Sequence, residues 1–347
     1  HDTTYYYLVS RDTNIIVMTG NMSSNWSESF DVPFTLTGIY NGTDYNPTWT
    51  VSNTSVICYA DTRIENLRIS ANRGNSNSNP TNSSDEDGVF YGNYHNVKLG
   101  RNIRQNGSYV NFQSIIGGMN SSSFWGGSTT GSSNDPTKYK IEIESGNYNS
   151  VSLTYGASNS YSQSTLYTIM YGVYGNDYDR ISLNNNNLIV YFCAAGSWGG
   201  NIHSSNDTLT PALNTIVKSG SFGTSEYDLT TGIYVGGRYG GEHFAPRTAY
   251  IEGGYVYNLI GGPLTTDSKN DVNDTLIYMT GGVVDAITGG AGTTTTYGNR
   301  ILQLTGGTVN YSVFGGSNGY DGSSSDGTLN GDSYIYIGGN ITIGNDD

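Results

Sequence analysis

The sequence predicts an all-β fold, a right-handed parallel β-helix of roughly nine coils with loop insertions. Three observations predict it. The 347 residues include 48 Gly, and only 13% of the chain is charged. A motif of two short apolar strands and two glycine pairs recurs along the chain. Within the first strand of each repeat, apolar and polar residues alternate with a period of two.

Helices are not expected in this chain. Gly, Asn, Ser and Thr are abundant, and these residues favour turns and caps over helix interiors. No stretch long enough for a helix combines an apolar stripe at helical spacing with good helix formers. We therefore expect short strands joined by polar loops.

The repeat is clearest towards the C-terminus. Residues 250–262 read YIEGGYVYNLIGG, residues 278–290 read YMTGGVVDAITGG, and residues 335–344 read IYIGGNITIG. When the repeats are aligned on the small pair that follows the first strand, they lie 41, 33, 34, 28, 25 and 32 residues apart. The aligned pairs are Ser145-Gly146, Asn186-Asn187, Ser219-Gly220, Gly253-Gly254, Gly281-Gly282, Gly306-Gly307 and Gly338-Gly339.

Each first strand has one apolar face. In TAYIEGG, residues 248–254, Ala249 and Ile251 point one way while Tyr250 and Glu252 point the other. The same alternation occurs in residues 138–146 and 300–307. A period of two indicates a strand with one buried face. Because so short a strand cannot bury that face alone, we expect each repeat to stack on the next at a rise of about 4.8 Å.

The glycine pairs are expected at the corners of the coils. Glycine adopts positive φ at little steric cost, and its missing Cβ lets neighbouring coils approach closely. Asn tolerates the left-handed conformation next best, which explains Asn186-Asn187 at the position that other repeats fill with glycine. Spacings of 25 and 28 residues are too short for propeller blades, which need about 40 residues each.

Two segments are expected. Residues 1–60 are predicted to form the N-terminal strands and cap, and residues 61–347 the coils, which we expect to continue or be capped beyond Asp347.

Cys58 and Cys193 both lie in apolar strands, and buried free thiols are common in such places. Because they are expected about four coils apart, roughly 19 Å at the strand-pairing rise, no disulfide between them is predicted.

The charge balance bears on which classes of partner are expected. The formal net charge is −14, and no basic run is present, so a nucleic-acid partner is not expected. No segment resembles a transmembrane span or a signal peptide. Low charge with abundant Gly, Tyr, Asn, Ser and Thr is typical of bacterial extracellular surface proteins, so we expect an extracellular, cell-surface location.

Three stretches carry a family resemblance. GRNI at residues 100–103, IIGG at 115–118 and KIEIESGNYNSV at 140–151 resemble surface-exposed, adhesin-like parallel β-helix proteins of Firmicutes-type bacteria. The resemblance extends from about Pro33 onwards, and the wider architecture also includes pectate lyases. It implies either a non-enzymatic surface protein or, as the alternative, a polysaccharide lyase or glycosidase.

Two clusters are candidates for catalysis. In GGRYGGEHFAPR, His243 is a candidate general acid or base, with Glu242 and Arg247 beside it; a solvated loop is the structural alternative. The second cluster resembles the acidic and basic groups of lyases on this fold, and it comprises Asp177, Asp179 and Arg180.

Aromatic residues are the candidates for ligand binding, because Tyr and Trp offer rigid amphipathic contact area; packing between coils is the alternative. These residues are Trp125, Trp198, Tyr167, Tyr171, Tyr174 and Tyr239. Calcium is the one cofactor considered, at Asp321, Asp326 and Asp332, since loops rich in carboxylates supply its oxygen ligands. A plain solvated loop is the alternative.

The sequence favours a non-enzymatic extracellular stalk or adhesin. Stacked coils form a stiff support that tolerates changes in its loops. The expected partners are a host or neighbouring-cell glycan or protein, or copies of the chain itself stacked end to end. A cleft that holds three or more carboxylates with a Lys or Arg would favour the enzyme instead.

Overall fold

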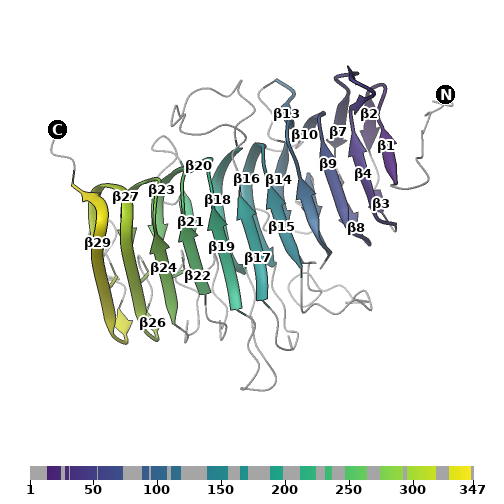
Figure 1. Cartoon of the computed structure of the whole chain (residues 1–347). Helices are drawn as coiled ribbons and strands as arrows, with labels where there is room; N and C mark the ends of the chain where they lie inside the picture. The colour runs from purple at the N-terminus through teal and green to yellow at the C-terminus, as the bar shows by residue number, and fades with distance from the viewer. Residues whose placement is uncertain are drawn as a thin grey trace, which may run out of the picture.

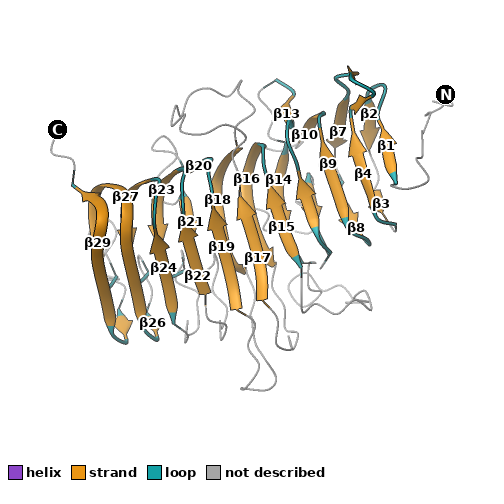
Figure 2. Ribbon diagram, in the orientation of Figure 1, coloured by secondary structure: helices purple, strands orange, loops and turns teal. Residues whose placement is uncertain are grey.

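The computed structural model describes residues 14–24, 28–30, 32–52, 54–72, 88–93, 95–107, 111–118, 139–154, 165–170, 188–197, 212–223, 231–236, 247–263, 274–291, 295–317 and 328–344. These residues are all-β and contain no helix (Figure 2). Among them no helix is therefore long and apolar enough to cross a membrane. The strands lie side by side in an elongated stack, with β1 (Ile15–Val17) at one end and β29 (Ser333–Ile343) at the other (Figure 1).

Two long parallel ladders make up a 21-stranded sheet. The first ladder runs through β1 (Ile15–Val17), β4 (Phe34–Thr37), β9 (Thr62–Glu65), β12 (Val97–Leu99), β15 (Lys140–Ile143), β17 (Thr165–Met170), β19 (Ala212–Val217), β22 (Arg247–Ile251), β24 (Thr275–Met279), and the first parts of β27 (Arg300–Phe314) and β29 (Ser333–Ile343). Each strand pairs with the equivalent strand of the next repeat.

The second ladder runs beside the first. It contains β3 (Glu28–Phe30), β8 (Val56–Cys58), β11 (Val89–Tyr91), β14 (Phe112–Ile116), β16 (Gly146–Thr154), β18 (Leu188–Ser197), β20 (Ser221–Phe222), β21 (Gly232–Tyr234), β23 (Tyr255–Ile260), β25 (Val283–Thr288), and the last parts of β27 and β29. Its parallel pairing is the arrangement expected from the repeat.

Smaller sheets complete the described structure. At the N-terminal end a third parallel ladder joins β2 (Met22–Ser24), β7 (Thr48–Ser52), β10 (Arg68–Asn72) and β13 (Arg104–Gln105). The strands β26 (Thr296–Tyr297) and β28 (Leu329–Asn330) also pair in parallel. The hairpin of β5 (Ile39–Tyr40) and β6 (Thr43–Asp44) is antiparallel. It turns at Asn41-Gly42, both at positive φ, as a two-residue hairpin turn requires.

The predicted alternation is confirmed. Ala249 and Ile251 of β22 are fully buried, whereas Tyr250 between them is only partly buried and Glu252 is exposed. Inward residues of successive strands form one apolar core that extends from Met18 to Val309. At its N-terminal end Trp49 packs edge-on against Phe112, with ring centroids 6.1 Å apart.

The corners confirm the expected role of glycine. Gly282 adopts a φ of +80°, and a Cβ at Gly281 would lie 2.4 Å from the backbone oxygen of Glu252 in the preceding repeat. Asn takes the same place nearer the N-terminus: Asn66 and Asn102 both have a φ of +58°. The Asn102 Nδ2 donates a hydrogen bond of 2.9 Å to the Asn66 Oδ1. Asn186-Asn187 lies outside the described residues.

The count of repeats differs from the prediction. The sequence predicted roughly nine coils, and each coil would give one strand to the first ladder. The described part of that ladder has eleven strands, of which β1 is the first. The repeat alignment missed β17, whose residues we interpreted as part of an aromatic contact surface. Cys58 and Cys193 are buried free thiols. Four pairing steps separate their strands, from β8 through β11, β14 and β16 to β18, which agrees with the expected separation.

Candidate functional site

The outer face of the first ladder holds its side chains in straight rows. In a parallel ladder each residue pairs with one residue of the next strand, so outward side chains line up from strand to strand. One row runs through Thr35, Arg63, Lys98 and Glu142. The same row continues through Ile169, Ile216, Tyr250, Tyr278, Gln303 and Tyr336. Its N-terminal half is therefore charged and its C-terminal half largely aromatic.

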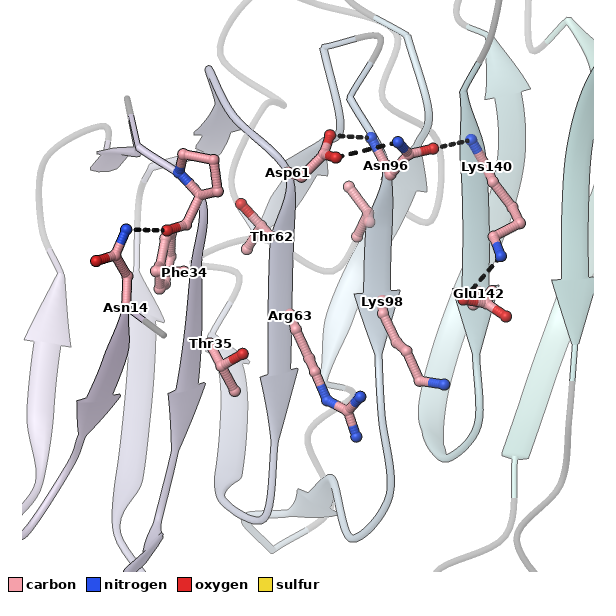
Figure 3. Close-up of a pocket in the computed structure, with 12 residues that line it drawn as sticks. Asn14, Phe34, Thr35, Asp61, Thr62, Arg63, Asn96, Lys98, Lys140 and Glu142 are labelled. Carbon is pink, nitrogen blue, oxygen red and sulfur yellow. Dashed lines mark hydrogen bonds and ion pairs between the residues drawn. The ribbon is translucent and has the colours of Figure 1, made fainter. Parts of the chain in front are cut away.

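A shallow groove crosses the charged half of this face (Figure 3). It encloses about 480 Å³. Its lining comes from β4, β9, β12 and β15, from residues just before these strands, and from the residue just before β1: Asn14, Pro33, Phe34, Thr35, Asp61, Thr62, Arg63, Asn96, Val97, Lys98, Lys140 and Glu142. The site thus consists of equivalent positions of successive repeats.

The rim of the groove is built by short polar side chains that precede the strands. Both Asp61 carboxylate oxygens accept hydrogen bonds from Asn96, one from its backbone N–H at 2.9 Å and one from its Nδ2 at 3.1 Å. The Asn96 Oδ1 in turn accepts a bond of 3.1 Å from the Lys140 N–H (Figure 3). Each side-chain oxygen accepts a hydrogen bond from a backbone N–H of the next repeat, just before the strands begin. It takes the role that a backbone carbonyl plays within the ladder, and so adds one bond to it.

The three cations that line the groove are each paired with a carboxylate. Arg63 donates to Glu65 through both Nε, at 2.8 Å, and Nη2, at 2.5 Å. The Lys98 Nζ lies 2.5 Å from a Glu144 carboxylate oxygen. The Lys140 Nζ lies 3.2 Å from one of Glu142. These partly exposed pairs contribute little to stability, but they present alternating positive and negative groups to a ligand in the groove.

A histidine borders the same rim. The His95 Nδ1 lies 3.9 Å from the Asp61 Oδ1. Burial of the imidazole lowers the pKa of His95, and the Asp61 carboxylate works in the opposite direction. The net effect favours neutral imidazole, which can either donate or accept a hydrogen bond at neutral pH.

The aromatic half of the row begins at β22. The rings of Tyr250 and Tyr278 are stacked, with centroids 5.3 Å apart. Tyr336, two strands further on, is 61% exposed. These rings and the Gln303 amide between them give a flat surface of apolar faces with polar edges, the combination that sugar- and protein-binding surfaces use.

Most of the residues singled out from the sequence lie outside the described residues. They are Glu242, His243, Asp177, Asp179, Arg180, Trp125, Trp198, Tyr171, Tyr174, Tyr239, Asp321 and Asp326. Tyr167 belongs to β17, where its backbone is in register with Lys140, a residue that lines the groove.

Arg247 is not part of a solvated loop. It is fully buried at the start of β22, and its Nη1 donates a hydrogen bond of 3.3 Å to the Gly236 carbonyl. It lies in register with Thr275 and Arg300, which are also buried. A side chain without exposed surface does not contact a ligand on the outer face, and the catalytic role considered for Arg247 stays a prediction.

The structure places Asp332 at an exposed strand start. Its Oδ2 accepts a hydrogen bond of 3.1 Å from the Tyr334 hydroxyl, and its backbone N–H donates to the Asn299 Oδ1 at 3.1 Å. Within the described parts of the chain, no three His, Cys, Asp or Glu side chains are grouped to hold a metal ion.

The groove was missed in the sequence because its residues alternate with core residues. Lys98, Lys140 and Glu142 are the polar members of period-two strands, and such residues usually form a plain solvated face. The signal that identifies them is the register between repeats, which the sequence spacing alone did not supply here.

No protein-family model, curated protein or solved structure matches this chain in the comparisons.

Proposed function

We propose that the chain is a right-handed parallel β-helix of an extracellular surface protein, a non-enzymatic stalk or adhesin that contacts a glycan or protein. The observation that carries this proposal is the outer row of the first ladder. It runs from Thr35 to Tyr336 without a break in pairing. A row of this kind suits an extended ligand, because it places one residue about every 4.8 Å along a line.

The chemistry of the row supports a polar ligand. The groove offers paired cations and carboxylates, while Tyr250 and Tyr278 offer stacked ring surfaces. Sugars present hydroxyl groups and apolar ring faces, so they fit both halves. A host or neighbouring-cell glycan, or a protein that carries one, is the partner class that we favour.

The proposal is tested by glycan-array binding of the whole chain. We expect retention of an extended glycan, and we expect the double variant Tyr250→Ala with Tyr278→Ala to bind at least about tenfold more weakly, since aromatic pairs contribute on the order of a kcal/mol or more. Tyr59→Ala is the matched control, because Tyr59 is 44% exposed and follows β8 of the second ladder. Equal binding by all three proteins, or no binding of any glycan or protein, would contradict the proposal.

A second candidate is a polysaccharide lyase or glycosidase, and the groove is the observation that favours it. It gathers the carboxylates of Asp61 and Glu142 with Arg63, Lys98 and Lys140 on one sheet face. The ion pairs of these cations weigh against it, because each cation is already held by a carboxylate of this chain rather than open to a substrate. If the chain is a lyase, a polysaccharide that it retains should yield an unsaturated, ultraviolet-absorbing product; if it is a glycosidase, new reducing ends should form. In either case Lys98→Ala should abolish the product. Retention without cleavage supports the binding protein.

A further inference from the structure

Tyr250 and Tyr278 present two phenol rings face to face on neighbouring strands. The residues are direct register partners in β22 and β24, and their rings lie 10° from parallel with centroids 5.3 Å apart. Nearly parallel rings on paired strands mean that the two side chains adopt similar conformations. Equivalent atoms of the two residues, including the ring carbons beside each hydroxyl, are therefore about 4.8 Å apart, one strand spacing.

The pair has no further phenol beside it in its row. Ile216 of β19 precedes Tyr250, and Gln303 of β27 follows Tyr278. An isoleucine side chain and an amide do not form the stabilised phenoxyl radical that a tyrosine forms. A radical on either ring of the pair therefore has the other ring as its nearest coupling partner along the row.

Both rings lie where an oxidant can act on them. Tyr250 and Tyr278 are partly buried rather than enclosed, and they belong to the outer face of the first ladder. Side chains near the surface change rotamer on a timescale of picoseconds to nanoseconds. Rotation about the side-chain bonds can therefore bring the two rings together while the backbones of β22 and β24 stay paired.

We propose that Tyr250 and Tyr278 form an oxidative cross-linking site, at which a peroxide-driven oxidation joins them as dityrosine. Each phenol gives up one electron and one proton to the oxidant, which leaves one radical on each ring. The radicals couple through a carbon beside each hydroxyl, and the hydrogens on those two carbons move to the phenol oxygens. The protein loses two hydrogen atoms in all, and one hydrogen peroxide molecule becomes two water molecules.

A bond at this position joins consecutive repeats. In a stack of repeats each unit contacts only its neighbours, so the stack can open between any two of them. A covalent link between β22 and β24 opposes that opening. It also closes a loop of 28 residues in the unfolded chain, as a disulfide does, and so stabilises the folded state. The inference rests on the ring geometry and does not depend on the proposed function.

Peptide mapping after oxidation tests the site. The whole chain is treated with a peroxidase and hydrogen peroxide at low protein concentration, so that coupling within one molecule prevails over coupling between molecules. We expect a monomeric product with dityrosine fluorescence, which on digestion yields a peptide that links Tyr250 to Tyr278 and lacks two hydrogen atoms. Absence of this linked peptide from the monomer, or linkage of Tyr250 to a different tyrosine in its place, overturns the proposal.

Phenylalanine variants make the test specific. Tyr278→Phe keeps a ring of the same shape but has no phenol to oxidise, so the linked peptide should be lost while the circular dichroism spectrum is retained. Tyr59→Phe is the matched control, because Tyr59 is exposed and follows β8 of the second ladder, and it should cross-link as wild type does. Loss of the linked peptide from the Tyr59→Phe chain as well would contradict the assignment of the site to the outer row.

Oxidation in urea separates proximity from intrinsic reactivity. Unfolding removes the strand pairing, and closing a loop of this length is then an infrequent event, so the yield of linked peptide should fall by about tenfold or more. An equal yield in native and unfolded chains would show that the fold does not direct the coupling. The native cross-linked chain should also unfold at a higher urea concentration than the untreated chain, whereas oxidised Tyr278→Phe should show no such shift. Equal midpoints for the cross-linked and untreated chains would overturn the stabilising role of the link.

Discussion

The rings of Tyr250 and Tyr278 stack on neighbouring strands, with centroids 5.3 Å apart and planes 10° from parallel. The two residues are direct register partners in β22 and β24, so the separation of their rings follows from the separation of parallel strands, about 4.8 Å. A stretch of 28 residues thus returns the chain to the same place one strand further on. The outer rows of the molecule, and with them the groove and the tyrosine surface, follow from this return.

Gly282→Ala is expected to lower the free energy of unfolding substantially. Gly282 has a φ of +80°, which costs an L-residue about 1–2 kcal/mol. A Cβ there would also lie 2.8 Å from the Gly253 carbonyl carbon, so the neighbouring corner would have to move. Urea unfolding followed by circular dichroism measures the change.

A matched variant separates the two contributions. Gly42 has a φ of +78°, and a Cβ there would meet nothing within 4 Å, so Gly42→Ala carries only the conformational cost of about 1–2 kcal/mol. If Gly282→Ala is no more destabilising than Gly42→Ala, the close approach of neighbouring corners is not a reason for glycine at position 282.

Tyr255→Phe is expected to destabilise the chain by about 1–3 kcal/mol, the usual effect of removing one partner of a buried hydrogen bond. The Tyr255 hydroxyl donates to the Asp285 Oδ2, and the Asn310 Nδ2 donates to the Asp285 Oδ1 at 2.7 Å. Asp285 is only 2% exposed. Thermal unfolding of Tyr255→Phe, of Asp285→Asn and of the double variant gives the coupling between them. Additive effects would mean that this hydrogen bond contributes nothing specific.

Acidification is expected to destabilise the fold through His95. Burial lowers its folded-state pKa, partly offset by Asp61, so the unfolded chain binds the proton more tightly. The free energy of unfolding therefore decreases as the pH falls below about 6.5, the unfolded value, and continues to decrease down to the folded pKa. His95→Gln removes this step, so unfolding curves of the two proteins should diverge in that range. Parallel pH profiles would contradict the account.

The native thiols are expected to be unreactive. Burial raises the pKa of Cys58 to about 12 and raises the pKa of Cys193 as well, and the thiolate is the reactive form. A thiol reagent at mildly alkaline pH should label neither cysteine in the native chain and both in urea. Rapid native labelling would show that the strands around β8 or β18 open readily.

The sequence predicted the parallel architecture because its signal is local. Alternation within 138–146 and 300–307 identified the buried residues, such as Ile141 and Leu302. Glycine pairs identified corners, since few other residues adopt positive φ. The weaker N-terminal repeats were harder to align because Asn66 and Asn102 replace glycine at the corner.

The site was harder to predict because it depends on the register between repeats. Nothing in the sequence near Arg63 indicates that it lies beside Lys98, 35 positions later, with Glu142 as the next residue of the row. Asn and Asp have a second structural role in this chain besides forming turns. Asp274 and Asn299, like Asp61 and Asn96, accept a hydrogen bond from the backbone N–H of the following repeat.

Distances between spin labels along the outer row test the central claim most directly. One label is placed at Lys98 and the second in turn at Tyr250, Tyr278 and Gln303, with the buried native thiols left in place. Register puts these residues four, five and six strand steps from Lys98, so pulsed dipolar spectroscopy should give about 19, 24 and 29 Å at the strand-pairing rise. Distances that do not increase in equal steps of about one strand spacing would contradict the parallel stacking of successive repeats.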